Sequence, residues 1–444
     1  MREMKDSGIE WIGNIPADWN VTKIKYLFSS GKGLSITKAD LEDNGLPVIS
    51  YGQIHSKENT NTDIKDSLIR FVDNKYEVFK QCKVNQYDFV FADTSEDYDG
   101  CGNCCYKRDN STLYAGYHSI VLHSFKERDN RFLAYLFKTD SWRKQLRETA
   151  SGVKVFSITQ KKLINTSVIL PPENQRIIIA DFLDQKCSEI DALTADIQAQ
   201  IETLEEYKKS VITEAVTKGI DPNVEMKDSG VKWIGNIPEK WAVPKILYCL
   251  KMPITDGPHT TPALYDEGIP FVSAEAVSFG RGSIDFTHIR GYISNEFYRE
   301  CCKKYIPSIG DIFMIKSGAT TGKVSIVDTD KIFTIWSPLA VFRTNSSILK
   351  EKYLFYVLQS DYIQKQIQTR WSYGTQENIG MRVLEKLKIT LPPINTQTEI
   401  ADFLDQKCSE IDQTISEKQQ QLETLAEYKK SLIYEYVTGK KEVA

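Results

Sequence analysis

Apolar residues recur at intervals of seven in a long charged stretch that follows Pro172 and contains no Pro or Gly before Gly219. A sustained seven-residue repeat predicts a helix that packs against another helix as a coiled coil. A helix of about 45 residues would extend about 70 Å, so it needs a partner along its whole length to bury the stripe. The residues that keep the spacing are Leu183, Ile190, Ile197, Leu204 and Val211, and Leu193, Ile201 and Tyr207 widen the stripe.

A second stretch, near the end of the sequence, repeats this pattern. Lys418 interrupts the spacing, while Ile415 and Leu422 lie on the adjacent edge of the stripe. The residues that keep the spacing are Leu404, Ile411, Leu425 and Leu432. We expect the two helices to pair with each other, antiparallel, as a rigid spacer. The alternative is two separate helices, each docked on its own domain.

The remaining sequence has a different pattern. Short β-branched and aromatic runs, separated by Gly, Pro, Asp and Asn, fill residues 21–150 and 242–370, and one strand is expected at 87–92. Helical spacing is limited to patches such as 131–147 and 352–369. We therefore predict an α+β protein in which two mixed α/β domains are joined by two long helices that form an antiparallel coiled coil.

The sequence contains an internal repeat. Residues 4–19, MKDSGIEWIGNIPADW, return at 226–241 with 12 of 16 positions identical, and IADFLDQKCSEID at 179–191 returns unchanged at 400–412. An internal repeat of this length predicts two copies of one module related by a pseudo-two-fold axis. We expect domains at 1–172 and 221–393, and spacer helices at 173–220 and, with a tail, 394–444. The end of the second helix should then lie near Met4.

Composition bounds the class of protein. With 444 residues, 41% hydrophobic and 26% charged, the chain is expected to form two to four globular domains. No run of about 18 apolar residues is present and the first ten residues are polar, so we expect no membrane span, no secretory signal and a cytoplasmic location. Nine cysteines at this low density predict reduced thiols.

Charge is distributed unevenly. Residues 173–219 and 394–439 each carry a net charge of −5, so the chain's −4 leaves +6 on everything else. The two domains are therefore mildly basic, which permits contact with phosphate, while the acidic helices suit a protein partner.

Motifs for catalysis are missing. GATTGKV at 318–324 has three residues between its glycines where a phosphate loop has four, and Val324 replaces the Mg-binding Ser or Thr, so we interpret it as a turn. Cys101, Cys104 and Cys105, with Cys82 and His118 or His123, offer zinc-type ligands but no second spaced pair, so we predict no metal.

The order of these motifs resembles one family. WIGNIP followed by Trp, the framework GIP at 268–270, GDI at 310–312, LPP, IADFLDQKCSEID and ETLxEYKKS, duplicated at one offset, are similar to the specificity subunit of Type I restriction-modification systems, called HsdS. The resemblance implies a role in bacterial defence and DNA methylation, with two target recognition domains that each read one half of a split, asymmetric DNA site. It also implies that the helices dock two methyltransferase subunits, which bind S-adenosylmethionine, and through them the motor-nuclease restriction subunits. This chain would bind no cofactor and catalyse nothing itself.

Polar loops of the two domains are the candidates for contact with double-stranded DNA, because base reading needs donors and acceptors in the major groove and cations on phosphate. In the first domain the candidates are Lys32, Ser35, Tyr51, Gln53, His55, Thr94, Ser95 and Tyr98, with Lys107, Arg108 and Lys154 expected on the backbone. In the second domain they are Asp256, His259, Thr260, Thr261, Lys316, Ser317, Thr320, Thr321, Lys323, Trp371, Tyr373, Thr375 and Gln376.

Two other functions fit the pattern less well. One is a coiled-coil adaptor that binds proteins and has no DNA specificity. The other is a fused enzyme with a degenerate methyltransferase or nuclease, which the missing motifs disfavour.

Overall fold

The structure, a computed structural model, describes residues 2–126, 128–152, 154–369 and 379–443. These residues form two compact units, one made of Met1–Asp196 with Gln420–Ala444 and the other of Ile197–Gln419. Each unit holds one globular module and half of each long helix. The predicted domain limits follow the sequence repeat and not these units, and they stay a prediction. Over the described residues, no helix is both long and apolar enough to cross a membrane.

The two long helices are α5 (Glu173–Lys218, 46 residues) and α11 (Ile394–Val437, 44 residues). In the first unit Asp191 of α5 forms an ion pair of 2.5 Å with Lys429 of α11. In the second unit Lys208 of α5 pairs with Asp412 of α11 at 2.5 Å. Since higher numbers in α5 meet lower numbers in α11, the helices are antiparallel, and their predicted pairing is confirmed.

Burial along the helices follows the predicted stripe closely but not fully. The predicted residues that are buried are Leu183, Ile190, Ile197, Ile201, Leu404, Ile411, Ile415 and Leu432, and those that are partly buried are Leu204, Val211, Leu422 and Leu425. Leu193 and Tyr207 are 47% and 56% exposed, so their assignment to the stripe was wrong. A stripe on one helix shows which residues are apolar, but only the partner's position decides which edge is covered.

The first unit is built on two sheets and the ends of the long helices. One sheet has the order β10-β8-β12-β4 and the other β11-β6-β7-β5, with β11 parallel to β6. The strands are β4 (Phe28–Lys32), β5 (Leu41–Glu42), β6 (Leu46–Ile49), β7 (Arg70–Val72), β8 (Phe89–Ala92), β10 (Cys104–Tyr106), β11 (Tyr114–Ala115) and β12 (Ser119–Ser124). Two-stranded pairs join β1 (Met4–Asp6) to β2 (Asn14–Pro16), β3 (Asn20–Lys23) to β14 (Ser167–Leu170), and β9 (Thr94–Ser95) to β13 (Phe156–Ser157).

Helices α2 and α3 carry the core of the first unit. The short helices are α1 (Tyr51–Ile54), α2 (Arg131–Lys138), α3 (Asp140–Thr149) and α4 (Gln160–Ile164). Phe137 of α2 and Trp142 of α3 lie in one buried cluster with Phe89 of β8 and Leu183 of α5. The module is therefore attached to its helix ends by a continuous apolar core.

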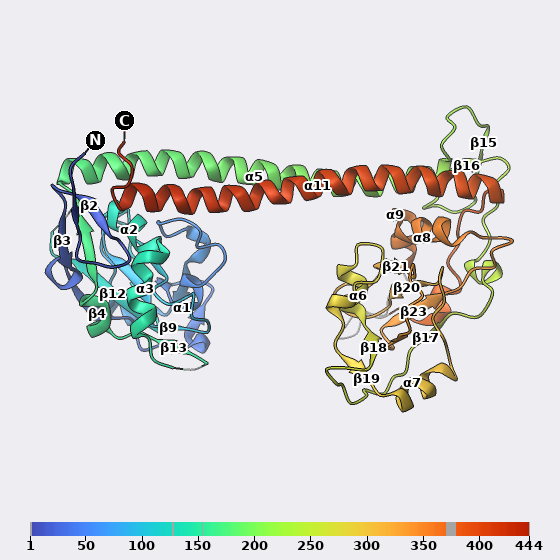
Figure 1. The fold of residues 1–444 in the computed structure, drawn as a ribbon, viewed down its shortest axis with the longest axis horizontal. Helices are drawn as coiled ribbons and strands as arrows, with labels where there is room; N and C mark the ends of the chain where they lie inside the picture. The colour runs from blue at the N-terminus through green and yellow to red at the C-terminus, as the bar shows by residue number, and fades with distance from the viewer. Residues whose placement is uncertain (1, 127, 153, 370–378, 444) are drawn as a thin grey trace. The chain divides into compact units, whose positions relative to one another are not determined.

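The second unit repeats this plan. Its main sheet has the order β17-β23-β20-β21, and a smaller one has the order β19-β18-β22. Figure 1 shows α8 and α9 between this sheet and the long helices. The strands are β15 (Met226–Asp228), β16 (Asn236–Pro238), β17 (Thr255–Asp256), β18 (Ile269–Val272), β19 (Tyr292–Ile293), β20 (Ile312–Ile315), β21 (Val324–Ile326), β22 (Thr334–Ile335) and β23 (Leu339–Phe342). The short helices are α6 (Ala274–Phe279), α7 (Asn295–Cys302), α8 (Glu351–Gln359), α9 (Asp361–Gln368) and α10 (Met381–Leu384).

Local breaks depart from the predicted elements. The predicted helical patch at 131–147 is divided at Thr139, whose side chain accepts a hydrogen bond from the Trp142 backbone and begins α3. The patch at 352–369 is divided at Ser360. The strand expected at 87–92 begins only at Phe89, because Tyr87 has a φ of 73° and turns the chain.

The end of α11 closes on the first hairpin. The Lys440 ammonium donates to the carbonyl oxygens of Ile12 at 3.0 Å and Asn14 at 2.6 Å. Figure 1 shows both marked chain ends at this unit. The predicted approach of the second helix to the N-terminal hairpin is therefore confirmed.

Candidate nucleic-acid interface

Several predicted residues of the first unit gather around His55, which ends α1. Its Nε2 lies 2.8 Å from the carbonyl oxygen of Thr94, and its Nδ1 lies 2.9 Å from the side-chain nitrogen of Asn103. A carbonyl oxygen only accepts, so Nε2 donates and Nδ1 accepts from Asn103. Both ring nitrogens are therefore occupied, and His55 positions α1 against β9. The side-chain oxygen of Gln53 accepts a hydrogen bond from the Ser50 backbone at 3.2 Å. Its amide N–H groups donate to no residue in the described part of the chain.

Tyr117, His118 and Asp93, which the sequence analysis did not select as DNA contacts, lie near Tyr51. Together with the residues around His55 they form a surface that we call the first face. The Tyr51 ring lies edge-on to Tyr117 and to His118, each with ring centroids 5.5 Å away. His118 Nδ1 is 3.2 Å from Asp93, and the His118 side chain is 58% exposed. His118 also has a φ of 52°, an uncommon conformation outside glycine that often marks functional positions. Only the pairing of distant strands brings these residues to Tyr51.

Lys32 and Ser35 lie on the same edge. Lys32 ends β4 opposite Ile120 of β12, and both Lys32 and Ser35 are exposed. Between them, a Cβ on Gly33 would stand 1.9 Å from the carbonyl oxygen of Gly116. Only glycine allows this approach, so Gly33 holds the Lys32 loop against the turn that carries Tyr117.

The remaining predicted residues of this edge are Ser95, which ends β9, Tyr98, which follows it, and Lys154, which precedes β13. Ser95 is buried and accepts from the Asp97 backbone at 3.4 Å. The Tyr98 ring is 46% exposed and packs edge-on against Phe156 with 5.6 Å between centroids. Lys154 is exposed in the neighbouring loop. Tyr98 and Lys154 therefore remain accessible.

Lys107 and Arg108 already have partners within the protein. Lys107 has a side chain only 4% exposed, forms an ion pair with Asp109, and donates to Ser111 at 2.6 Å. Arg108 forms ion pairs with Asp63 at 3.3 Å and with Asp184 of α5 at 3.2 Å. These cations balance the protein's own charges, so their placement does not favour the predicted contact with DNA backbone.

The second unit has an ionic cluster at the start of the predicted loop. Asp256 of β17 is buried, and its carboxylate lies 3.2 Å from Lys316, 2.5 Å from Lys304 and 3.2 Å from His259. Burial opposes ionisation of Asp256, but hydrogen bonds from Lys304 and Lys316 outweigh it and hold its pKa below the ordinary value. The His259 side chain is 72% exposed above this cluster. The structure thus brings together the predicted residues Asp256, His259 and Lys316, and it adds Lys304, which the sequence analysis did not select.

We call the surface around the Asp256 cluster the second face. Residues at matching strand positions of the first and second faces carry exchanged charges. Lys32 pairs with Ile120 in β12 as Asp256 pairs with Ala340 in β23. Asp93 follows β8, and its backbone N–H donates to the carbonyl oxygen of His118 at 3.1 Å. Lys316 follows β20 in the same way, and its backbone N–H donates to the carbonyl oxygen of Pro338 at 2.8 Å. The first face therefore has Lys and Asp where the second has Asp and Lys.

Other predicted residues of the second unit lie in the turn between β20 and β21. Thr321 donates to the carbonyl oxygen of Gly318 at 2.6 Å, and Lys323 donates to Ser278 at 3.1 Å. The turn is a glycine-rich hairpin connection, as predicted. Ser317 and Thr320 are partly exposed, and Thr260 and Thr261 are exposed. The predictions for Trp371, Tyr373, Thr375 and Gln376 lie outside the described residues.

Trp336 was also missed by sequence reasoning. It follows β22 at the position of Gly116 in the first unit, and the Arg290 guanidinium lies 4.6 Å above its ring. Its buried indole nitrogen has no hydrogen-bond partner among the described residues. An aromatic ring under a cation suits a nucleic-acid surface. No sequence motif marks it, because Trp336 lies in a short turn.

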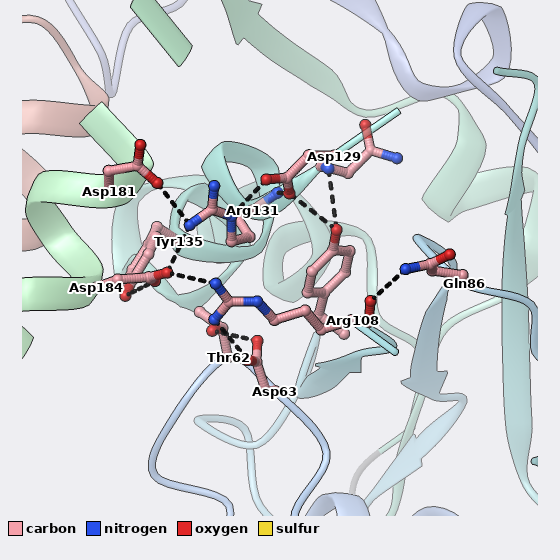
Figure 2. Close-up of polar contacts among 11 residues, drawn as sticks. Thr62, Asp63, Gln86, Arg108, Asp129, Arg131, Tyr135, Asp181 and Asp184 are labelled. Carbon is pink, nitrogen blue, oxygen red and sulfur yellow. Dashed lines mark hydrogen bonds and ion pairs between the residues drawn. The ribbon is translucent and has the colours of Figure 1, made fainter. Parts of the chain in front are cut away.

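Each face is mounted on the long helices by the same contact. The Tyr135 hydroxyl donates to Asp184 of α5 at 2.7 Å, and Arg131 donates to the same carboxylate at 2.7 Å (Figure 2). Burial raises the pKa of Tyr135, and Asp184 adds to the shift. In the second unit Tyr356 donates to Asp405 of α11 at 2.6 Å. Asp184 and Asp405 are the same position of the 13-residue repeat, so both modules are attached alike.

The cysteine cluster is buried among apolar residues. Burial raises the pKa of Cys104 to about 11 and of Cys105 to about 12, and it raises the pKa of Cys101. Thiols of this kind stay protonated and unreactive at neutral pH. Within the described part of the chain, no group of three or more His, Cys, Asp or Glu is arranged to hold a metal ion.

Comparison with known proteins gives the family. Residues 16–203 and 262–424 match the model of the type I restriction modification DNA specificity domain. Two relatives from Methanocaldococcus jannaschii are similar over nearly the whole chain. The putative type I restriction enzyme MjaX specificity subunit is 26% identical over 97% of this chain and 95% of its own, and the type I restriction enzyme MjaVIII specificity subunit is 27% identical over 96% and 93%.

A solved structure supports the fold. One chain, from work on the complex assembly and conformational transition of the type I R-M system, matches with a TM-score of 0.69 and 18% identity, over 96% of this chain and 99% of that one. The matched domain favours the DNA-specificity interpretation over an adaptor without DNA specificity. The chain belongs to the family of type I restriction modification DNA specificity proteins.

Proposed function

We propose that each globular module reads one half of a split, asymmetric site in double-stranded DNA. The exchange of charges at equivalent positions carries the proposal: Lys32 and Asp93 in one module stand where Asp256 and Lys316 stand in the other. A shared framework with different polar groups at its loops is what two readers of unlike sequences require. The chain would recognise DNA and catalyse nothing alone.

The helices supply docking sites for two copies of one partner. In α5 the exposed residue Gln185 and the partly exposed residue Lys186 both donate to Glu189, at 2.8 and 2.7 Å. In α11 Gln406 and Lys407 donate to Glu410 in the same way, at 3.0 and 2.9 Å. Buried positions of a seam need only be apolar, whereas these exposed networks are identical without a packing reason. We assign the partner as the methyltransferase subunit, which would bind S-adenosylmethionine in the cytoplasm and through which restriction subunits would join.

Selection of randomised DNA tests the reading function. The purified chain, mixed with its methyltransferase subunit, is used to select duplexes at near-physiological salt, and the bound DNA is sequenced. A split motif with two unlike halves and a fixed gap is expected. Recovery of unselected DNA by an intact protein complex would contradict the reading function and favour an adaptor.

Charge reversal tests the docking faces separately. Glu189→Lys and Glu410→Lys are matched variants, each of which alters one of the two identical networks. Each single variant should bind one methyltransferase subunit and the double variant none, as measured by the mass of the purified complex. Two bound subunits in the double variant would rule out these faces.

A further inference from the structure

A pocket of about 450 Å³ opens in the second unit beside the hairpin formed by β15 and β16. Its walls include Val224, Glu225, Glu239, Trp241, Thr396 and Glu399. The internal repeat gives this pocket a counterpart in the first unit, where the hairpin of β1 and β2 has the same register. The backbone contact from Glu239 to Glu225, 2.8 Å, is matched there by one of 2.9 Å from Ala17 to Glu3.

In the first unit an arginine occupies the equivalent place. The Arg2 guanidinium lies 5.6 Å from the ring centroid of Trp19, forms an ion pair of 2.9 Å with Asp18, and donates to the Gln175 side chain at 2.6 Å. The indole N–H of Trp19 donates to the same Gln175 oxygen at 2.9 Å. Arg2, Trp19 and Gln175 thus provide one another's hydrogen-bond and cation–π partners, and Trp19 is fully buried.

The second unit keeps the tryptophan and lacks both partners. Val224 stands at the position of Arg2, and Thr396 stands at that of Gln175. Trp241 is only 5% exposed, and its indole N–H has no hydrogen-bond partner among the described residues. The indole nitrogen is not one of the buried polar atoms that lack a partner in the described residues, so this N–H opens into the pocket, where an acceptor of a ligand can reach it.

The charged residues that line the pocket indicate the kind of ligand that it binds. Glu239 and Glu399 replace Ala17 and Ile178 of the first unit, while Glu225 matches Glu3. The carboxylates of Glu225, Glu239 and Glu399 form no ion pair within the described part of the chain, although the Lys240 ammonium also lines the pocket. A planar cation is the group that can both stack on an indole ring and pair with carboxylates.

We propose that this pocket receives an arginine side chain of a partner protein, with its guanidinium over Trp241 and between the carboxylates of Glu239 and Glu399. A carbonyl oxygen of the same peptide accepts the hydrogen bond from the Trp241 indole. Arginine is favoured over lysine because the guanidinium stacks in a plane and its donors form a fork. The site does not depend on DNA reading.

A peptide titration of the full chain tests the site. The seven tryptophans are labelled with ¹⁵N on the indole, and the Trp241 signal is assigned with Trp241→Phe. The probe is acetyl-Gly-Arg-Gly-amide, and the matched peptides carry lysine or the uncharged citrulline. The Trp241 signal should shift saturably with the arginine peptide, and the citrulline peptide should bind roughly tenfold more weakly. An absent shift, or equal shifts with all three peptides, would overturn the proposal.

Two variants give independent readouts and do not alter the tryptophan. Glu239→Gln with Glu399→Gln should weaken arginine-peptide binding by roughly threefold to tenfold, because both ion pairs are lost. Lys240 stands at the position of Asp18, so Val224→Arg, Lys240→Asp and Thr396→Gln together rebuild the arrangement of the first unit. The chain's own arginine should then fill the pocket and abolish the peptide response. If the rebuilt variant bound the peptide as the parent does, the pocket would not be the site.

Discussion

The carboxylate of Asp256 lies 3.2 Å from the ammonium of Lys316, and in the first unit the same two positions are held by Lys32 and Asp93. In each face an exposed histidine stands 3.2 Å from the aspartate, His259 in one and His118 in the other. The charge pattern thus inverts while the aspartate–histidine contact is kept. The two faces therefore differ in where the positive and the negative side chain stand on one shared framework.

Replacing the two exposed histidines should affect different half-sites. His259→Ala and His118→Ala should each weaken binding to one half-site by about 1–3 kcal/mol, the range for loss of a base contact. Binding of each variant to duplexes altered in one half-site at a time measures this. Equal weakening on all sequences would show that the histidines contact phosphate and carry no specificity.

Removing the charge of Asp256 should destabilise the second unit. In Asp256→Asn the nearly buried Lys316 ammonium, 12% exposed, loses its carboxylate partner. The expected cost is about 1–3 kcal/mol, measured as a lower midpoint of thermal unfolding. Because the pKa of Asp256 is lowered in the folded chain, this difference should persist at neutral pH and vanish as the pH falls through the folded pKa. Asp266→Asn, at an exposed position, is the matched control and should change little.

The sequence predicted the helices better than the faces, for a physical reason. A seven-residue repeat is local, so α5 and α11 could be placed from the spacing of residues such as Leu183 and Ile190 alone. The cluster at Asp256 needs Lys316, 60 residues away, and strand pairing across β17, β23 and β20 decides that meeting. His118 meets Tyr51 for the same reason. Side-chain type marked some members of each face, but only long-range pairing assembled them.

Helix pairing should depend on the covered edge of the stripe. Ile201 is 4% exposed and Leu193 is 47% exposed, although both were assigned to the stripe from the sequence. Ile201→Asp would bury a charge and should cost about 3–5 kcal/mol, whereas Leu193→Asp should change the unfolding midpoint little. Leu204→Asp and Leu425→Asp, at partly buried positions, should fall between them. Equal effects of all four substitutions would contradict the pairing.

Stability of the first unit should fall as the pH rises through the range in which His123 loses its proton. His123 Nδ1 lies 2.7 Å from Asp88, and this hydrogen bond raises the pKa of His123 although burial opposes it. A raised pKa stabilises the fold fully below the unfolded value, about 6.5, and the contribution is lost as the pH rises through the folded value.

His123→Asn should therefore lower the unfolding midpoint most in mildly acidic solution. The gap between parent and variant should narrow as the pH rises from the unfolded pKa of about 6.5 through the higher folded pKa, as thermal unfolding at a series of pH values would measure. A gap that stayed constant would mean that packing, and not the ionic hydrogen bond to Asp88, accounts for the effect.

The closure of α11 on the first hairpin predicts that the chain tolerates circular permutation. Gly439 lies against Pro16 and Trp19, as Gly219 lies against Pro238 and Trp241, and in the second case the chain itself makes the connection. Joining Val443 to Arg2 through a linker of about four to six residues, with new ends between Asp221 and Val224, should preserve both modules. The unfolding midpoint should stay within a few degrees of the parent's, and the permuted chain should still purify with its methyltransferase subunits. A second permutant, with its ends inside β12, interrupts a central strand and should fail to fold. If the first permutant failed as well, the contact of Lys440 with the hairpin would not be equivalent to the covalent connection in the second unit.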